Sequence, residues 1–145
     1  MGNVRTNVTY AYDIASPSSV RVLPGQLKIA RVFHGCLMLD QEGKLIVAAG
    51  SIASGRTQTV EILDLNTETW SDGSVLPGTP NYNYQFIQSN NVWIGFGYYS
   101  AGPPDVVQYY ASDDEWEQVP IPEFAPNLAS NKPYLAVDVV NFAVC

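Results

Sequence analysis

The sequence predicts an all-β protein built from repeated four-stranded antiparallel units. Apolar runs of four to seven residues, rich in Val, Ile, Leu and Tyr, recur along the 145-residue chain. Polar turn segments such as DQEG, LNTE, QSNN and ASDDE separate these runs. Since no segment keeps a helical period of apolar residues over three turns, we expect no helix.

The first complete unit is expected at residues 31–77. Its segment HGCLMLDQEGKLIVAAG contains two apolar strands around a polar turn and ends at Gly50. The run LIVAA lacks clean alternation, as is typical of a strand buried on both faces of a sheet. After the loop SIASGR, the segment VEILDLNTETWSDGSVLP supplies two more strands and contains Trp70.

The second complete unit, expected at residues 82–120, repeats this order. YNYQFIQSNNVWIGFG ends at Gly97, which is 47 residues after Gly50. The loop YYSAGPPD and the segment VVQYYASDDEWEQVP follow, with Trp116 placed 46 residues after Trp70. Tyr109 stands seven residues before Trp116, as Leu63 does before Trp70, so the whole neighbourhood of the tryptophan recurs.

The two ends of the chain carry halves of the same unit. Residues 1–25 resemble the second half, because Tyr12 and Asp13 match Leu63 and Asp64, and VLPG at 22–25 matches VLPG at 75–78. This copy lacks the tryptophan. Residues 132–145, which contain KPYLAVDVVNFAVC, resemble the first half. The expected organisation is therefore a half unit, two complete units and a second half unit in one domain.

A four-stranded unit every 46–47 residues has the length of a propeller blade. The residue pattern resembles the kelch repeat, in which a basic residue precedes two strands that end in a glycine pair, and an aromatic residue stands seven before a tryptophan. Arg31 is the basic residue, and Ala49-Gly50 and Phe96-Gly97 stand for the glycine pair. Neither unit keeps both glycines, and Leu63 replaces the aromatic residue. The resemblance implies an incomplete kelch-type β-propeller.

The repeated residues have a structural interpretation. Glycine at the end of an inner strand permits a tight turn and the close approach of a neighbour. Tryptophan on an outer strand buries about 150–250 Å² and would fill the space between blades. We therefore expect packing roles for Gly50, Gly97, Trp70, Tyr109 and Trp116 rather than ligand contact. Buried free thiols are expected at Cys36 and Cys145, which lie in apolar stretches, although one disulfide would also fit.

The chain is short for a closed ring. Propellers have about four to eight blades, and this sequence holds about three blades' worth. We expect a fragment or truncated copy of a longer propeller; the alternatives are an oligomer that completes the ring and an open arc. Open blade edges would favour self-association.

The composition argues against some classes of partner. The net charge is −7 with only seven Lys and Arg, which argues against a nucleic-acid partner. No apolar run approaches the roughly 20 residues of a membrane span. The first residues lack the apolar core of a secretory signal, which favours a cytoplasmic location.

The resemblance implies a scaffold that binds another protein through loops at one rim. Those loops are Ser51–Arg56, Tyr98–Asp105 and the stretches around Arg31 and Asn81–Asn83. Arginine and tyrosine dominate the binding energy of many interfaces. The candidate binding residues are Arg31, Arg56, Tyr82, Tyr98 and Tyr99.

An enzyme is the alternative class. Some kelch-like propellers are copper radical oxidases, whose chemistry needs a tyrosine–cysteine pair and at least two histidine ligands. This chain has one histidine, His34, expected to be a hydrogen-bonded structural residue. Asp113, Asp114 and Glu115 precede Trp116 in a turn and are expected to form a solvated hairpin tip. We therefore expect no catalysis, no metal and no cofactor. A non-functional truncated remnant is the third possibility.

Overall fold

The computed structural model describes residues 5–12, 15, 19–89, 92–98, 105–120, 137–138 and 143–144. These residues form antiparallel strands and one short 3-10 turn, η1 at Asp40–Glu42, with no α-helix in the described part of the chain. The predicted all-β class is thus confirmed, as are the four-stranded antiparallel units. None of the described sheets closes on itself.

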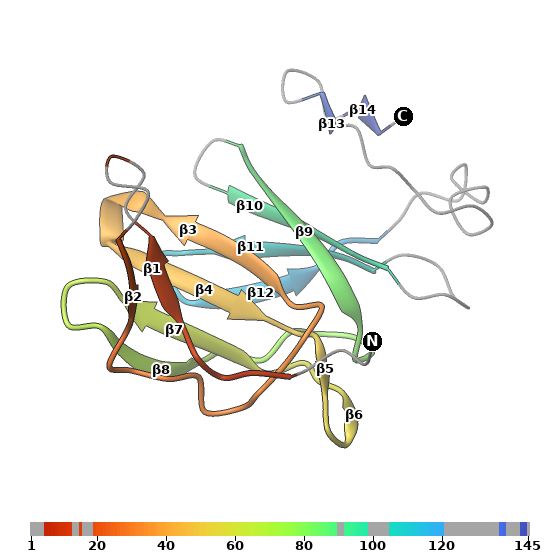
Figure 1. Cartoon of the computed structure of the whole chain (residues 1–145). Helices are drawn as coiled ribbons and strands as arrows, with labels where there is room; N and C mark the ends of the chain where they lie inside the picture. The colour runs from red at the N-terminus through yellow and green to blue at the C-terminus, as the bar shows by residue number, and fades with distance from the viewer. Residues whose placement is uncertain are drawn as a thin grey trace.

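The first sheet has the order β3-β4-β7-β8, with strands Gly35–Leu39, Lys44–Ala48, Val60–Asp64 and Thr69–Gly73 (Figure 1). All of its strands fall inside the unit expected at residues 31–77. The loop predicted at Ser51–Arg56 is itself a small hairpin, β5 (Ser51–Ile52) and β6 (Gly55–Arg56). It forms because Ala53 and Ser54 leave a two-residue turn beside Gly55, whose φ of 130° suits glycine.

The second sheet has the order β12-β11-β10-β9. Its strands are Tyr82–Ser89 (β9), Val92–Tyr98 (β10), Asp105–Tyr110 (β11) and Glu115–Gln118 (β12). Two further hairpins correspond in position to the half units. They are β1–β2 (Tyr10–Tyr12 and Val20–Val22) and β13–β14 (Val137–Asp138 and Ala143–Val144).

The two four-stranded sheets pack face to face around one core. From the first sheet, side chains on alternate positions of β3, β4 and β7 point toward the second sheet. From the second sheet, aromatic side chains of β9, β11 and β12 meet them. The cluster consists of Leu37, Leu39, Ile46, Ala48, Ala49, Val60, Leu76, Tyr84, Val107, Tyr109 and Trp116.

Glycines make this close packing possible. The ring of Tyr84 lies over Gly97, and the ring of Phe86 lies over Gly95, so that a β-carbon at either glycine would overlap the ring. A β-carbon on Gly35 of the first sheet would lie 2.7 Å from the Cβ of Tyr84. Three glycines therefore receive two aromatic side chains, and the inner strands β3 and β9 approach each other directly.

The two repeat tryptophans, Trp70 on β8 and Trp116 on β12, lie on edge strands and face the preceding unit. Strand register places Trp116 opposite Tyr109, on the face of the second sheet that packs on the first. The same register places Trp70 opposite Leu63, on the face of the first sheet turned away from the second. There the chain of the N-terminal half unit covers Trp70, since a β-carbon on Gly25 would lie 3.3 Å from its Cδ1.

The expected burial of Cys36 is wrong. Strand β3 alternates, with Gly35, Leu37 and Leu39 buried and Cys36 and Met38 exposed. Cys36 is a free thiol on the face away from the second sheet. The run HGCLML contains too few polar residues for this alternation to be evident in the sequence.

Alternation along β3 can be tested with two neighbouring substitutions. Leu37→Ala should lower the free energy of unfolding by about 2–5 kcal/mol, because Leu37 fills the core between the sheets. Met38→Ala, on the exposed face, should change it by less than about 1 kcal/mol. Urea denaturation of both variants measures the difference. Equal effects would contradict the burial pattern of this strand.

Candidate functional site

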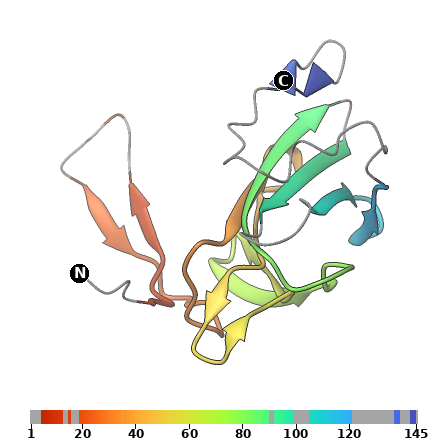
Figure 2. The same cartoon turned by 90° about the vertical axis from the view of Figure 1, so that its right-hand side faces the viewer.

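The connections of both sheets gather at one end of the molecule, which we call the loop end. It comprises residues 31–34, 49–59 and 74–83. Antiparallel pairing places them together, since Gly35 pairs with Ala48, Val60 with Ala48 and Gly73, and Tyr82 with Tyr98. The hairpin β5–β6 projects from this end (Figure 2). The interval between β10 and β11, residues 99–104, lies outside the described residues.

Backbone hydrogen bonds join the loops of the two sheets. Val32 and Ser51 exchange bonds of 3.1 and 2.8 Å, which tie the entry of β3 to β5. The N–H of Gly50 donates to the carbonyl of Asn81 at 3.3 Å. The N–H of Asn83 donates to the carbonyl of Phe33 at 2.7 Å. The loop end is therefore one connected surface rather than separate loops.

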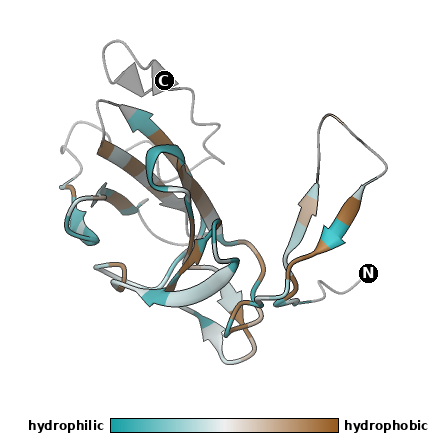
Figure 3. Ribbon diagram, turned by 90° about the vertical axis from the view of Figure 1, so that its left-hand side faces the viewer, coloured by the Kyte–Doolittle hydropathy of each residue, from teal (hydrophilic) through white to brown (hydrophobic). Residues whose placement is uncertain are grey.

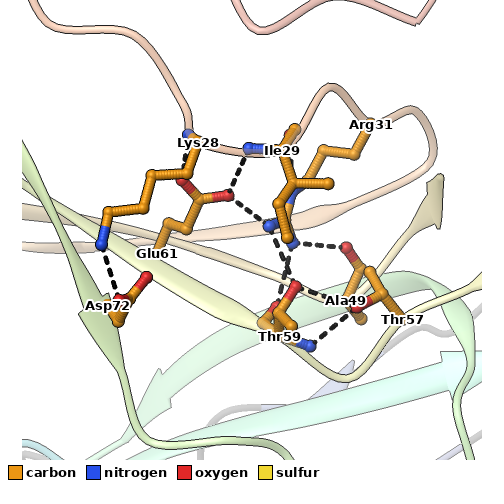
Figure 4. Close-up of polar contacts among 8 residues, drawn as sticks. All are labelled: Lys28, Ile29, Arg31, Ala49, Thr57, Thr59, Glu61 and Asp72. Carbon is orange, nitrogen blue, oxygen red and sulfur yellow. Dashed lines mark hydrogen bonds and ion pairs between the residues drawn. The ribbon is translucent and has the colours of Figure 1, made fainter.

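Arg31 is buried beneath this surface and has an acceptor for every guanidinium N–H (Figure 4). Its ion-pair partner is Glu61 on β7, whose carboxylate also accepts the backbone N–H of Lys28 at 2.5 Å. Two buried opposite charges are thus paired and hydrogen-bonded. The acceptors of Arg31 are the carbonyls of Ile29 (3.4 Å), Ala49 (2.9 Å) and Thr59 (2.9 Å), Oγ1 of Thr59 (3.1 Å) and the carboxylate of Glu61.

This environment corrects the expectation that Arg31 contacts a partner. Its side chain is only 1% exposed, and all of its donors are used inside the chain. The conformation of Ala49 helps to aim its carbonyl at Arg31, because its φ of 61° is left-handed. Gly50 follows with φ 103° and lies against the carbonyl of Val32. Ala49 thus adopts the left-handed backbone conformation that glycine favours, although it replaces the first glycine of the repeat's glycine pair.

The other predicted binding residues are distributed as follows. Arg56 lies at the end of β6, half-buried. Tyr82 opens β9 and pairs through its backbone with Tyr98, the last residue of β10. Tyr99 lies outside the described residues.

Phe33 is an exposed aromatic residue at the loop end that sequence reasoning did not single out. It is 47% exposed, and its φ of 56° is left-handed. Asn83, bonded to the carbonyl of Phe33, is also exposed with φ 57°. Non-glycine residues in this conformation are uncommon and concentrate at functional sites. The only sequence signal was an aromatic residue in the polar interval between LKIA and the first strand.

Two tyrosine–aspartate pairs brace the sheets. The hydroxyl of Tyr109 donates to Asp114 at 3.0 Å, and the same carboxylate accepts the N–H of Ser74 at 3.1 Å. Burial raises the pKa of Tyr109, and the charge of Asp114 raises it further. Asp113 and Glu115 are exposed, as expected of a solvated hairpin tip, whereas Asp114 is half-buried and links both sheets.

The second pair lies nearer the loop end. Burial raises the pKa of Tyr84, as do the charge of Asp105 and a hydrogen bond to it. Asp105 also accepts the side-chain amide of Asn81 at 3.1 Å. Asp105 thereby holds Asn81, whose carbonyl accepts the hydrogen bond from Gly50. The Tyr84–Asp105 pair thus supports the hydrogen-bonded loops.

His34, expected to be a hydrogen-bonded structural histidine, is an exposed residue between Phe33 and β3. Partial burial of the imidazole and the positive charge of Arg31 lower the pKa of His34. Over the described ranges, no group of three or more His, Cys, Asp or Glu side chains is placed to hold a metal ion. Within those same ranges, no helix has the length and apolarity to cross a membrane.

Comparison with known proteins gives no family assignment. No protein-family model matches the chain, and a search of curated proteins finds no significant match.

Removal of Arg31 should destabilise the protein strongly. Arg31→Met leaves Glu61 as an uncompensated buried charge, and the expected loss is about 3–5 kcal/mol of unfolding free energy. Lys28→Met is the control, because the Lys28–Asp72 pair is exposed and worth less than about 1 kcal/mol. Chemical denaturation compares them. If Arg31→Met cost no more than the control, the buried pair would not stabilise this fold.

Ionisation of the two braced tyrosines predicts alkaline instability. An unfolded tyrosine has a pKa near 10, and the folded-state pKa of Tyr84 and Tyr109 is raised. Their contribution is therefore complete below about pH 10 and is lost as the pH rises through the folded-state pKa.

The expected slope is about 1.4 kcal/mol per pH unit for each tyrosine. The variant Tyr84→Phe/Tyr109→Phe should lose less stability between pH 10 and 11 than the wild type, as measured by urea midpoints. Tyr10→Phe, at a position 62% exposed, should keep the wild-type slope. If all three proteins lost stability equally between pH 10 and 11, the burial of Tyr84 and Tyr109 would not be the cause of the alkaline instability.

Proposed function

We propose that the chain is an incomplete kelch-type β-propeller that binds another protein through its loop end. The observation that supports this most directly is the hydrogen-bonded joining of loops from two sheets beneath an exposed aromatic residue. The repeat spacing and the stacking of the sheets through Trp116 support the propeller arrangement.

Preorganisation favours binding at this end. Loop ordering on association opposes affinity by about 0.5–1.5 kcal/mol per immobilised flexible side chain, and a surface already fixed avoids much of that cost. Val32, Ser51, Asn81 and Asn83 are held by backbone bonds in the free chain. A partner therefore meets loops that are already placed.

The chemistry of the surface fits protein recognition. Phe33 is an aromatic residue that is 47% exposed, and Arg56 lies on the projecting hairpin of the same end. Aromatic and arginine side chains are enriched in the centres of protein interfaces. Several backbone N–H and carbonyl groups of the loops, by contrast, are engaged within the chain. Side chains of the partner would accordingly pack against Phe33 and Arg56.

The test begins with capture of proteins from a cell extract on the immobilised chain, followed by purification of the captured protein. Isothermal titration calorimetry then gives its dissociation constant. Phe33→Ala and Arg56→Ala should each weaken binding about tenfold or more, as truncated hot-spot residues do. Circular dichroism and thermal unfolding check that each variant remains folded.

The matched control is Leu65→Ala. Leu65 is 40% exposed and lies in the β7–β8 turn, at the opposite end of the first sheet. Its truncation should leave the dissociation constant unchanged. A partner that bound Phe33→Ala and Arg56→Ala as tightly as the wild type would place the binding surface elsewhere.

A further inference from the structure

The β1–β2 hairpin presents an apolar face to solvent. Strand register pairs Tyr10 with Val22 and Tyr12 with Val20, so that all four side chains lie on one side. Their exposures are 62%, 54%, 55% and 58% in that order. The hairpin stands apart from the two sheets; β2 is hydrophobic at both of its ends, and β1 is of intermediate hydropathy (Figure 3). These four large side chains form an apolar surface that no other described residues bury.

The internal repeat shows which faces of the two complete units are equivalent to this face of the hairpin. Tyr12 matches Leu63 in sequence, and its cross-strand partner Val20 then matches Trp70, the partner of Leu63. In the second sheet, the equivalent face carries Tyr109 and packs on the first sheet. The hairpin therefore exposes the face with which each complete unit contacts the unit before it.

The opposite face of the hairpin is already used. Arg21 pairs across the hairpin with Ala11, on the other side from Tyr12. Its guanidinium forms an ion pair with Glu68 of the first sheet, including a bond of 2.9 Å from Nη1 to Oε2. The hairpin is thus oriented, and its apolar face cannot turn inward against its own first sheet without loss of this pair.

A complementary surface lies on the far side of the second sheet. Register places Ile94 opposite Ile87 and Phe96 opposite Val106, on the face away from the core. These four side chains are half-buried. None of the described sheets packs over them. In the repeating order, this is the face that would receive the next unit.

Strand pairing gives a second, independent match. In both complete sheets, the first strand of the outer hairpin pairs with an inner hairpin, β7 with β4 and β11 with β10. The equivalent strand β1 pairs only with β2 in the described part of the chain. The hairpin β13–β14 resembles the inner half, and four residues separate Asp138 from Ala143, as four separate Leu39 from Lys44. It has the hydrogen-bonding edge that β1 requires.

We propose that a second copy of this chain covers the β1–β2 hairpin. Its β13–β14 hairpin pairs with β1, and the far face of its second sheet packs on Tyr10, Tyr12, Val20 and Val22. This inference rests on the proposed propeller arrangement. Three units from each copy give 3 + 3 = 6, within the range of about four to eight blades, whereas one copy closing on itself gives three. The interaction is reciprocal, so two copies form a closed pair.

The mass in solution is the first test. Sedimentation equilibrium of the 145-residue chain should give twice 15.9 kDa. Tyr12→Asp and Val20→Asp place a charge in the apolar face and should each raise the dimer dissociation constant by about tenfold or more. Both positions are exposed within one copy, so folding should be retained. Leu65→Asp, on an exposed turn, is the control and should remain dimeric.

Disulfide trapping tests the register. In the first sheet, Leu45 is the second residue of β4 and pairs with Leu63. Val144 is likewise the second residue of β14, and Tyr12 matches Leu63, so Val144 of one copy should pair with Tyr12 of the other. Two singly substituted chains, Tyr12→Cys and Val144→Cys, are prepared with Cys36→Ser and Cys145→Ser. When mixed and oxidised, they should give a disulfide-linked heterodimer on a non-reducing gel. Val22→Cys mixed with Val144→Cys should not, since Val22 lies on the far strand of the hairpin.

Three outcomes would overturn the proposal. A monomer at all concentrations, with no crosslink on mixing, excludes a second copy as the occupant. A disulfide within one molecule of a Tyr12→Cys/Val144→Cys double variant identifies the chain's own hairpin instead. A ladder of higher masses indicates an open array rather than a closed pair. A monomer that still binds its partner through Phe33 would remove this proposal and leave the binding function intact.

Discussion

The buried pair between Arg31 and Glu61 is the constraint on which the arrangement of the first sheet depends. A guanidinium shielded from water needs acceptors for all of its donors, and here they come from the segment before β3, the turn after β4 and the start of β7. Because these acceptors are fixed by one side chain, three segments distant in sequence hold one geometry. The hydrogen bonds that join the loops are built on that geometry, through Gly50 and Val32.

The contact between the sheets depends on a different principle, the match between glycine and aromatic residues. Because Gly95 and Gly97 have no side chains, the rings of Phe86 and Tyr84 can lie directly on the backbone of β10 and also contact Gly35 of the first sheet. Trp116 then closes the outer part of the same interface against Phe86 and Tyr109. The side chains at the inner positions of this interface are therefore small, and those at the outer positions are large.

Much of this could be predicted from the sequence, and the exceptions have physical reasons. Short apolar runs and polar turns were sufficient for the β class and for the two four-stranded sheets, since both are local patterns. The burial of Arg31 was not predictable, because it depends on Glu61, thirty residues away and unremarkable in its own strand. Phe33 was missed because exposure is a property of the assembled loops. Cys36 was misplaced because neighbouring apolar residues on a strand can face opposite environments.

The repeated packing of one unit on the next accounts for the two sheet faces that remain exposed. A unit whose tryptophan face packs on its predecessor always creates two unequal surfaces, one at each end of the stack. In this chain those surfaces are the face around Tyr12 and the face around Phe96. The loop end is perpendicular to the direction of stacking, since it is formed by strand termini rather than by sheet faces. The proposed association through the outer sheet faces and the proposed recognition at the loop end would therefore use separate surfaces, and that association would leave Phe33 exposed.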